Sequence, residues 1–145
     1  LRHDLYNPGG AINPSEFRFP YENDSFDFVF LTSVFTHMSA IEVRSYLAEI
    51  KRVLQPGGTC FLTAFLMDSI SEKLVDHGKS SQAFKQQWGD GFTVDPECPE
   101  SAVAFKDEKM LAWIRQSGFE LKGRFPGYWS GRCCGFSYQD ILIVS

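Results

Sequence analysis

Residues 26–66 constrain the fold most, because two apolar runs there flank one amphipathic helix pattern. The runs cover residues 26–32 and 59–66 and are almost continuously apolar instead of alternating. Such runs are typical of strands that are covered on both faces inside a parallel sheet. A helix between two such strands predicts a right-handed crossover that makes them parallel neighbours.

The helix pattern begins at Ser39, which can cap the first turn together with Glu42 three residues later. Lys51 and Arg52 suit the negative end of the helix dipole, and the Pro-Gly-Gly sequence at 56–58 predicts the end of the helix. Apolar residues recur between these ends at three- and four-residue steps and form one stripe: Val43, Tyr46, Leu47, Ile50, Val53 and Leu54.

The segment after the second strand carries weaker patterns. Ser69 and Glu72 repeat the capping spacing and predict a short helix that ends near Gly78. Residues 79–106 are mostly polar and poorly periodic, so we expect an irregular excursion with a small hairpin around Gly89.

The last part of the chain predicts one more helix and two strands. Asp107 can cap a helix that Gly118 closes. Residues 119–125 then alternate apolar and polar, and residues 141–144 are wholly apolar. The chain has 145 residues, which suits one domain. We therefore predict a single α/β domain over residues 1–145, with a mostly parallel sheet, an antiparallel last hairpin and helices on the faces.

Charge and composition argue against several classes of partner. The net charge is −4 and no long Lys/Arg run relieves it, so we expect no nucleic-acid partner. The apolar runs are too short to span a bilayer, so we expect no membrane association either. The four cysteines form no CxxC pair, which predicts free thiols in a reducing cytoplasm and no metal site.

A set of short motifs resembles the class I S-adenosylmethionine (SAM)-dependent methyltransferases. They are Phe19-Pro20-Tyr21, the strand opening at 23–29, His37-Met38 and the helix end at 51–58, with Gln55 where that family usually has lysine. Each motif alone is weak, but their order and spacing make the set specific over residues 17–66. The resemblance implies a Rossmann-like fold, SAM as cofactor and methyl transfer as the reaction.

The family's glycine-rich cofactor turn has no counterpart in the chain. Gly9-Gly10 and Gly57-Gly58 are the only paired glycines, and neither lies between a strand and a helix in that order. The resemblance therefore implies an N-terminally truncated domain that begins near the family's third strand. A nicotinamide- or flavin-binding protein would also need a phosphate-cradling glycine turn, so we rank that alternative last.

The missing part leaves two functional interpretations. In one, the intact protein transfers a methyl group to a small-molecule or sugar-like acceptor. In the other, the chain is a non-catalytic truncated relative that acts as a self-associating globular module. Loss of the neighbouring strand would bare the edge of residues 26–32, so we expect a homodimer, with that strand as the contact.

The resemblance also points to cofactor-binding residues. Asp4 falls where the family often places a carboxylate that accepts a hydrogen bond from the adenine amino group, although a solvated turn aspartate is the plainer interpretation. Thr32, Ser33 and Val34 follow the first strand, at the edge where open α/β sheets bind ligands. The family uses this segment against the methionine part of the cofactor.

Four further residues are candidates for chemistry or substrate contact. His37 lies near the same crevice and could deprotonate an acceptor as general base, although a histidine that shapes the loop before the Ser39 cap is the plainer interpretation. Tyr128, Trp129 and Arg132 lie between the last two strands and are candidates for lining a substrate pocket. Loop aromatics also pack over neighbouring elements, so that alternative stays open.

Overall fold

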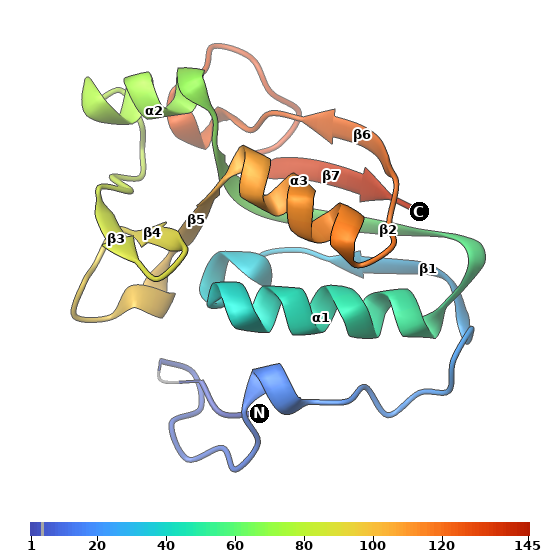
Figure 1. Ribbon diagram of the computed structural model, residues 1–145. Helices are drawn as coiled ribbons and strands as arrows, with labels where there is room; N and C mark the ends of the chain where they lie inside the picture. The colour runs from blue at the N-terminus through green and yellow to red at the C-terminus, as the bar shows by residue number, and fades with distance from the viewer. Residues whose placement is uncertain (4) are drawn as a thin grey trace.

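The computed structural model describes residues 1–3 and 5–145. A seven-stranded sheet runs through it in the order β3-β4-β5-β2-β7-β6, with β1 also paired to β2 (Figure 1). The strands are β1 (Phe26–Leu31), β2 (Leu54–Met67), β3 (Gln86–Trp88), β4 (Gly91–Thr93), β5 (Val103–Lys106), β6 (Leu121–Phe125) and β7 (Asp140–Val144). The helices are α1 (Ala40–Val53), α2 (Ser69–Asp76) and α3 (Asp107–Gln116), and short 3-10 turns are η1 (Pro14–Glu16), η2 (Phe35–His37), η3 (Pro99–Ser101) and η4 (Tyr128–Ser130).

The predicted crossover unit is confirmed. β1 and β2 pair in parallel, with Phe28 opposite Thr59 and Leu31 opposite Leu62, and α1 connects them. β2 begins at Leu54, five residues earlier than expected. Phe26 pairs with Leu54 and Phe28 pairs with Thr59, so the extra residues of β2, which include Pro-Gly-Gly, bulge out at this register shift. Gly57 lies in that shift at φ +82°, a conformation that favours glycine.

Local capping chemistry fixes the start of the crossover helix α1 and the start of α2. The backbone N–H and the hydroxyl of Ser39 both donate to the Glu42 carboxylate, at 2.7 and 2.8 Å, so the predicted capping box is present. The cap of α2 was expected at Ser69 but is Asp68, whose Oδ1 accepts from the backbone N–H groups of Ile70 and Ser71. A carboxylate one residue earlier reaches the free N–H groups of the first turn better than the Ser69 hydroxyl.

The excursion at 79–106 is more regular than expected. β3 and β4 form the predicted hairpin, with Trp88 opposite Gly91. β4 then pairs with β5, and β5 runs parallel to the end of β2, with Phe65 opposite Ala104. β5 was missed because its short apolar run resembles a fragment of a helix as much as a strand, and only its pairing with β2 distinguishes the two.

The last two strands complete the sheet as predicted. β7 is antiparallel to both β2 and β6, so the sheet ends in an antiparallel hairpin on an otherwise mostly parallel core. α1 and α3 lie together over one face of the sheet (Figure 1), and the larger buried cluster lies between them and that face. Within the described residues no helix has the length and apolar character needed to cross a bilayer.

The opposite face of the sheet is only partly covered. α2 and η4 pack over its carboxyl end, around a smaller cluster that includes Phe65, Met67 and Trp129. Phe28 and Phe30 project from β1 on this face, with 52% and 67% of their surface exposed. The apolar pattern of β1 is typical of a strand covered on both faces, but no helix of the described residues lies over these two rings.

Candidate functional site

The candidate site lies at the carboxyl edge of the sheet. β1 and β2 are parallel, and β6 runs in the same direction because both β2 and β6 are antiparallel to β7. Their carboxyl ends therefore meet at one edge, where open α/β sheets bind ligands. Four segments lie at this edge, on the left in Figure 1, because each comes after the carboxyl end of a strand. They are residues 32–34 and η2 after β1, the start of α2 after β2, and the loop 126–139 after β6.

Ser33 is held in an unusual conformation at the tip of β1. Its φ is +57°, in the left-handed region that non-glycine residues seldom adopt. Its backbone N–H donates to the Thr63 hydroxyl at 2.9 Å, and its hydroxyl pairs with the Gln139 side-chain amide at 3.0 Å. The Thr63 hydroxyl also donates to Gln139 at 2.5 Å. Strain that neighbouring groups hold in place at a sheet edge is typical of a binding site.

The neighbours of Ser33 differ in how far they reach solvent. Thr32 is exposed beside it, whereas Val34 is half-buried and packs against the main core. The structure therefore brings all three predicted residues to the carboxyl edge, with Thr32 and Ser33 available to a ligand. Asp4, the fourth cofactor residue expected, lies outside the described residues.

His37 ends η2 at the same edge and is half-buried. Its Nδ1 lies 2.9 Å from the backbone carbonyl oxygen of Glu100. A carbonyl oxygen only accepts, so Nδ1 carries the proton and Nε2 of the neutral ring keeps a free lone pair. The backbone carbonyl of His37 accepts a bond from His3 Nε2 at 3.0 Å. These two hydrogen bonds of His37 thus hold the loop in shape, and they leave Nε2 of His37 able to accept a proton.

The three expected substrate residues occupy different environments. Trp129 is fully buried and packs against Phe65, so it supports the loop from below. Tyr128 is half-exposed, with its ring 5.6 Å from that of Tyr138. Arg132 reaches from the loop to Asp68, with its Nη2 2.6 Å from Oδ2. Only Tyr128 and Arg132 are therefore placed to contact a ligand.

Asp140 anchors the loop 126–139 and was not predicted from the sequence. Its buried carboxylate accepts from the backbone N–H of Leu66 at 2.8 Å, from that of Gly127 at 2.9 Å and from the Trp129 indole at 2.7 Å. Burial raises the pKa of Asp140, and these three donors act against that rise. Both ends of the loop are thus fixed to the carboxyl end of β2.

Asp68 links the loop to α2 and β6. It caps α2 and also faces the guanidinium groups of Arg124 and Arg132, at 3.0 and 2.6 Å. Burial alone would raise the pKa of Asp68, but the Ser71 backbone N–H and the two arginines outweigh it, so the pKa is lowered. The sequence offered no signal for Asp68, Gln139 or Asp140, because each partner lies far away along the chain.

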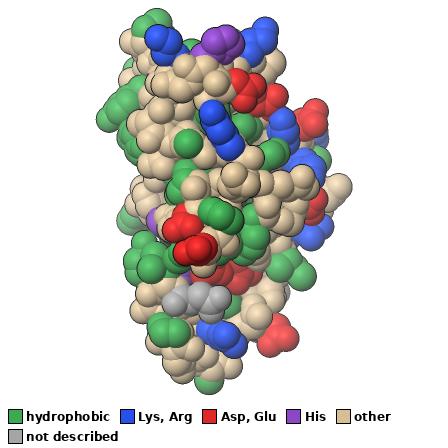
Figure 2. Space-filling model, turned by 90° about the vertical axis from the view of Figure 1, so that its left-hand side faces the viewer, with side chains coloured by type: hydrophobic (Ala, Val, Ile, Leu, Met, Phe, Trp, Pro, Cys, Tyr) green, Lys and Arg blue, Asp and Glu red, His purple; other side chains and the backbone are tan. Residues whose placement is uncertain are grey.

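The donor set of the edge fits one side of a SAM site. Thr32 and Ser33 offer hydroxyl and backbone groups there, but the chain has no glycine-rich turn between a strand and a helix to form the opposite wall. Among residues 1–3 and 5–145, no three His, Cys, Asp or Glu side chains gather as a metal site requires. Lys and Arg side chains are scattered among acidic and apolar ones on the side that carries the edge (Figure 2).

Comparison with known proteins agrees with this architecture. Residues 11–62 match the family model of a methyltransferase domain. A SAM-dependent methyltransferase from Methanosarcina mazei aligns with TM-score 0.60 and 20% identity, over 92% of this chain and 64% of that one. A SAM-dependent methyltransferase from Thermotoga maritima aligns with TM-score 0.52 and 17% identity, over 88% of this chain and 59% of that one. A glycopeptide N-methyltransferase complexed with sinefungin aligns with TM-score 0.52 and 16% identity, over 92% of this chain and 57% of that one. The chain thus spans about three fifths of these solved structures.

Proposed function

We propose that this chain takes part in methyl transfer from SAM, because it has the fold of the SAM-dependent methyltransferases and their domain sequence over residues 11–62, as its motifs predicted. The observation that carries the proposal is the strained, exposed Ser33 at the carboxyl edge of the parallel pair β1 and β2. SAM supplies an electrophilic methyl group on a sulfonium, so a protein mainly has to hold the acceptor in line with it and exclude water.

In this proposal Thr32, Ser33 and Val34 form the wall that contacts the methionine part of the cofactor, and Asp4 accepts from the adenine amino group. Sinefungin, a SAM analogue, bound to a relative of the same fold supports the choice of cofactor. The residues assigned here form one side of the cofactor site, and the chain spans about three fifths of the solved structures it matches.

The acceptor side of the proposal rests on His37, Tyr128 and Arg132. The free Nε2 of His37 would accept a proton from the acceptor hydroxyl or amine as the methyl group transfers. Tyr128 and Arg132 would contact the acceptor, with Trp129 packed below them. The acceptor in this proposal is a small molecule or a sugar-like compound.

Calorimetric titration of the chain with SAM tests the cofactor assignment. We expect binding that the exposed substitution Thr32→Glu weakens, because the new carboxylate would repel the carboxylate of the methionine part. Thr59→Glu is the matched control, since it adds the same charge toward the amino end of β2 and should leave binding unchanged. Absence of any heat at millimolar SAM would refute cofactor binding by this chain.

The second candidate function is that of a self-associating module. One edge of β1 pairs with β2, and no other strand of the described residues pairs with its second edge. Phe28 and Phe30 lie exposed beside that edge with their ring centroids 6.4 Å apart. An apolar strand edge of this kind favours pairing with a second chain, so we propose a homodimer through β1.

Solution scattering tests this association. We expect a dimer that Phe30→Lys converts to a monomer, because a buried lysine would oppose the contact. Phe136→Lys is the matched control, as Phe136 is the same residue type and is also exposed, at 85% against 67% for Phe30, but lies in the loop before β7. A monomeric unmodified chain would refute the dimer.

The cellular setting is part of the same proposal. Cys133 and Cys134 are exposed and unpaired, and Cys98 is half-buried and unpaired, which favours a reducing compartment such as the cytoplasm. The scattered positive charges of Figure 2 favour a small-molecule partner over nucleic acid.

A further inference from the structure

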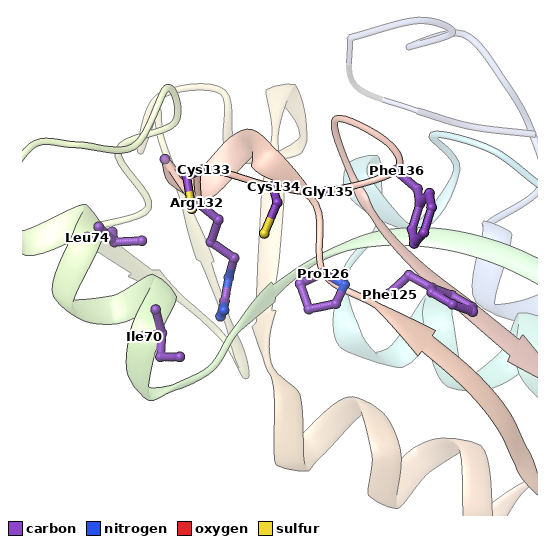
Figure 3. A pocket seen from close by; sticks show the side chains of 10 residues that line it. Ile70, Leu74, Phe125, Pro126, Arg132, Cys133, Cys134, Gly135 and Phe136 are labelled. Carbon is purple, nitrogen blue, oxygen red and sulfur yellow. The ribbon is translucent and has the colours of Figure 1, made fainter.

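An apolar pocket of about 850 Å³ opens between α2, the carboxyl end of β6 and the loop 126–139. Ile70 and Leu74 project into it from α2, and Phe125 and Phe136 lie together at its other end (Figure 3). Arg132 enters between these two groups. The volume falls in the range of small-molecule sites, roughly 300–1,000 Å³.

The chemistry of the lining selects an apolar ligand. Arg132 is the only charged side chain that lines the pocket among the described residues, and its Nη2 already pairs with the Asp68 carboxylate. The remaining side chains are aliphatic, aromatic, proline or thiol groups. A ligand would therefore bury mainly apolar surface here. Its one charged contact would be Arg132, whose charge is already balanced by Asp68.

Phe136 forms an apolar rim of the pocket that is exposed to solvent. Its side chain is 85% exposed, and its only aromatic neighbour among the described residues is Phe125, with ring centroids 5.7 Å apart in an edge-to-face arrangement. Covering a ring of this size removes apolar surface from water, which stabilises a bound hydrophobic molecule.

The position of the pocket connects it to the candidate site. Phe125 ends β6 at the same edge of the sheet as Ser33. The loop that forms one side of the pocket ends at Gln139, whose amide holds the Ser33 hydroxyl. One loop, anchored by Asp140, therefore borders both the pocket and the segment proposed to contact the cofactor.

We propose that this pocket is the acceptor site, and that the acceptor is a hydrophobic, ring-bearing small molecule with one polar group. Of the residues proposed above for the acceptor, Arg132 lines this pocket, whereas Tyr128 and His37 lie outside its lining. This inference rests on the proposed methyl transfer and narrows its substrate class. A sugar-like acceptor fits the lining poorly, because its many hydroxyl groups would lose water and find almost no hydrogen-bond partners among aliphatic and aromatic side chains. A ring with a single hydroxyl or amine has no such penalty.

Binding of the neutral fluorescent probe N-phenyl-1-naphthylamine tests the pocket without SAM. We expect saturable binding whose Kd rises about tenfold or more in Ile70→Lys, because a charge then enters the apolar lining. Ile41→Lys is the matched control, since Ile41 and Ile70 are both exposed isoleucines in the first turn of a helix, at 58% and 53%. The control should bind the probe as the unmodified chain does.

A third variant separates the pocket from the open sheet face. Phe30→Lys should leave probe binding unchanged, because Phe30 does not line the pocket. Loss of binding in Phe30→Lys with retention in Ile70→Lys would place the probe on the open face and overturn the proposal. Equal affinities in all variants would overturn it as well.

Displacement of the probe tests the ligand class. We expect 2-naphthol to displace it and methyl glucoside to leave it bound, and the reverse order would overturn the hydrophobic assignment. The SAM titration is independent of this measurement. Probe binding without SAM binding would support the pocket as a ligand site and refute the methyl transfer. SAM binding combined with unchanged probe affinity in Ile70→Lys would refute the pocket alone.

Discussion

Replacing Asp140 should destabilise the fold more than any comparable surface change, because this carboxylate holds the loop that borders the proposed site. Only 3% of Asp140 is exposed, and it accepts three hydrogen bonds, from Leu66, Gly127 and Trp129. In Asp140→Ala these three buried donors lose their acceptor.

The magnitude follows from these contacts. Each buried donor without an acceptor costs about 1–3 kcal/mol, so three give roughly 3–9 kcal/mol. Removing the carboxylate also removes its own cost of burial, which is several kcal/mol. We therefore expect Asp140→Ala to lower the free energy of unfolding by about 3 kcal/mol, or the Tm by about 10 °C.

Asp140→Asn should have an intermediate effect. Its one carbonyl oxygen can take the place of Oδ2, which accepts from Leu66 and Trp129, but its NH₂ then faces the N–H of Gly127. One bond is lost and two donors oppose each other, which costs about 1–2 kcal/mol.

Thermal and urea unfolding, followed by circular dichroism, measure this order. The control is Asp90→Ala, because Asp90 is an exposed carboxylate whose ion-pair partner, Lys109, is also exposed. We expect the control to unfold as the unmodified chain does. If Asp140→Ala stays within 1 kcal/mol of the unmodified chain, roughly a third of the loss expected here, the anchoring role of Asp140 is wrong.

Three further predictions concern helix capping, pH and thiol reactivity. Ser39→Ala removes a cap that bonds Glu42 and should lower the free energy of unfolding by about 1 kcal/mol in urea titrations; no change would refute the capping box as a stabilising contact. Because the pKa of Asp68 is lowered in the folded chain, its contribution is present above the ordinary value of 3.8 and is lost as the pH falls through the folded value. The stability difference between the unmodified chain and Asp68→Asn should therefore be constant from about pH 5 to about pH 8 and should shrink below about pH 4; an unchanged difference in acid would contradict this. Ellman's reagent should label exposed Cys133 quickly and buried Cys60 only on unfolding, since burial raises the pKa of Cys60 to about 12, and fast labelling of Cys60 would show that the core is open.

Much of the fold could be predicted because its signals are local. The capping box of α1 spans Ser39 to Glu42, and the apolar stripe behind it repeats every turn, so both are visible in a few consecutive residues. The parallel pairing of β1 and β2 follows from the helix between them, because a strand-helix-strand crossover makes its two strands parallel. The hairpin of β3 and β4 likewise follows from its two-residue turn.

The candidate site was predicted only in part. The sequence placed residues 32–34 and His37 at the carboxyl edge, because they directly follow β1. It gave no indication that Gln139 holds Ser33 or that Asp140 bonds to Leu66, since these partners are 106 and 74 residues apart along the chain. It also gave no reason to separate buried Trp129 from the accessible Tyr128.

The amino-acid sequence by itself determined the crossover unit, the class of fold and the direction of the strands, because hydrophobic period and capping act within one or two helical turns. Only the tertiary structure decided that β5 extends the sheet, that Phe28 and Phe30 remain uncovered and that α2 and the loop 126–139 enclose an apolar pocket. These features depend on which surfaces meet in space, and burial is a property of the packed elements and not of the residues that form them.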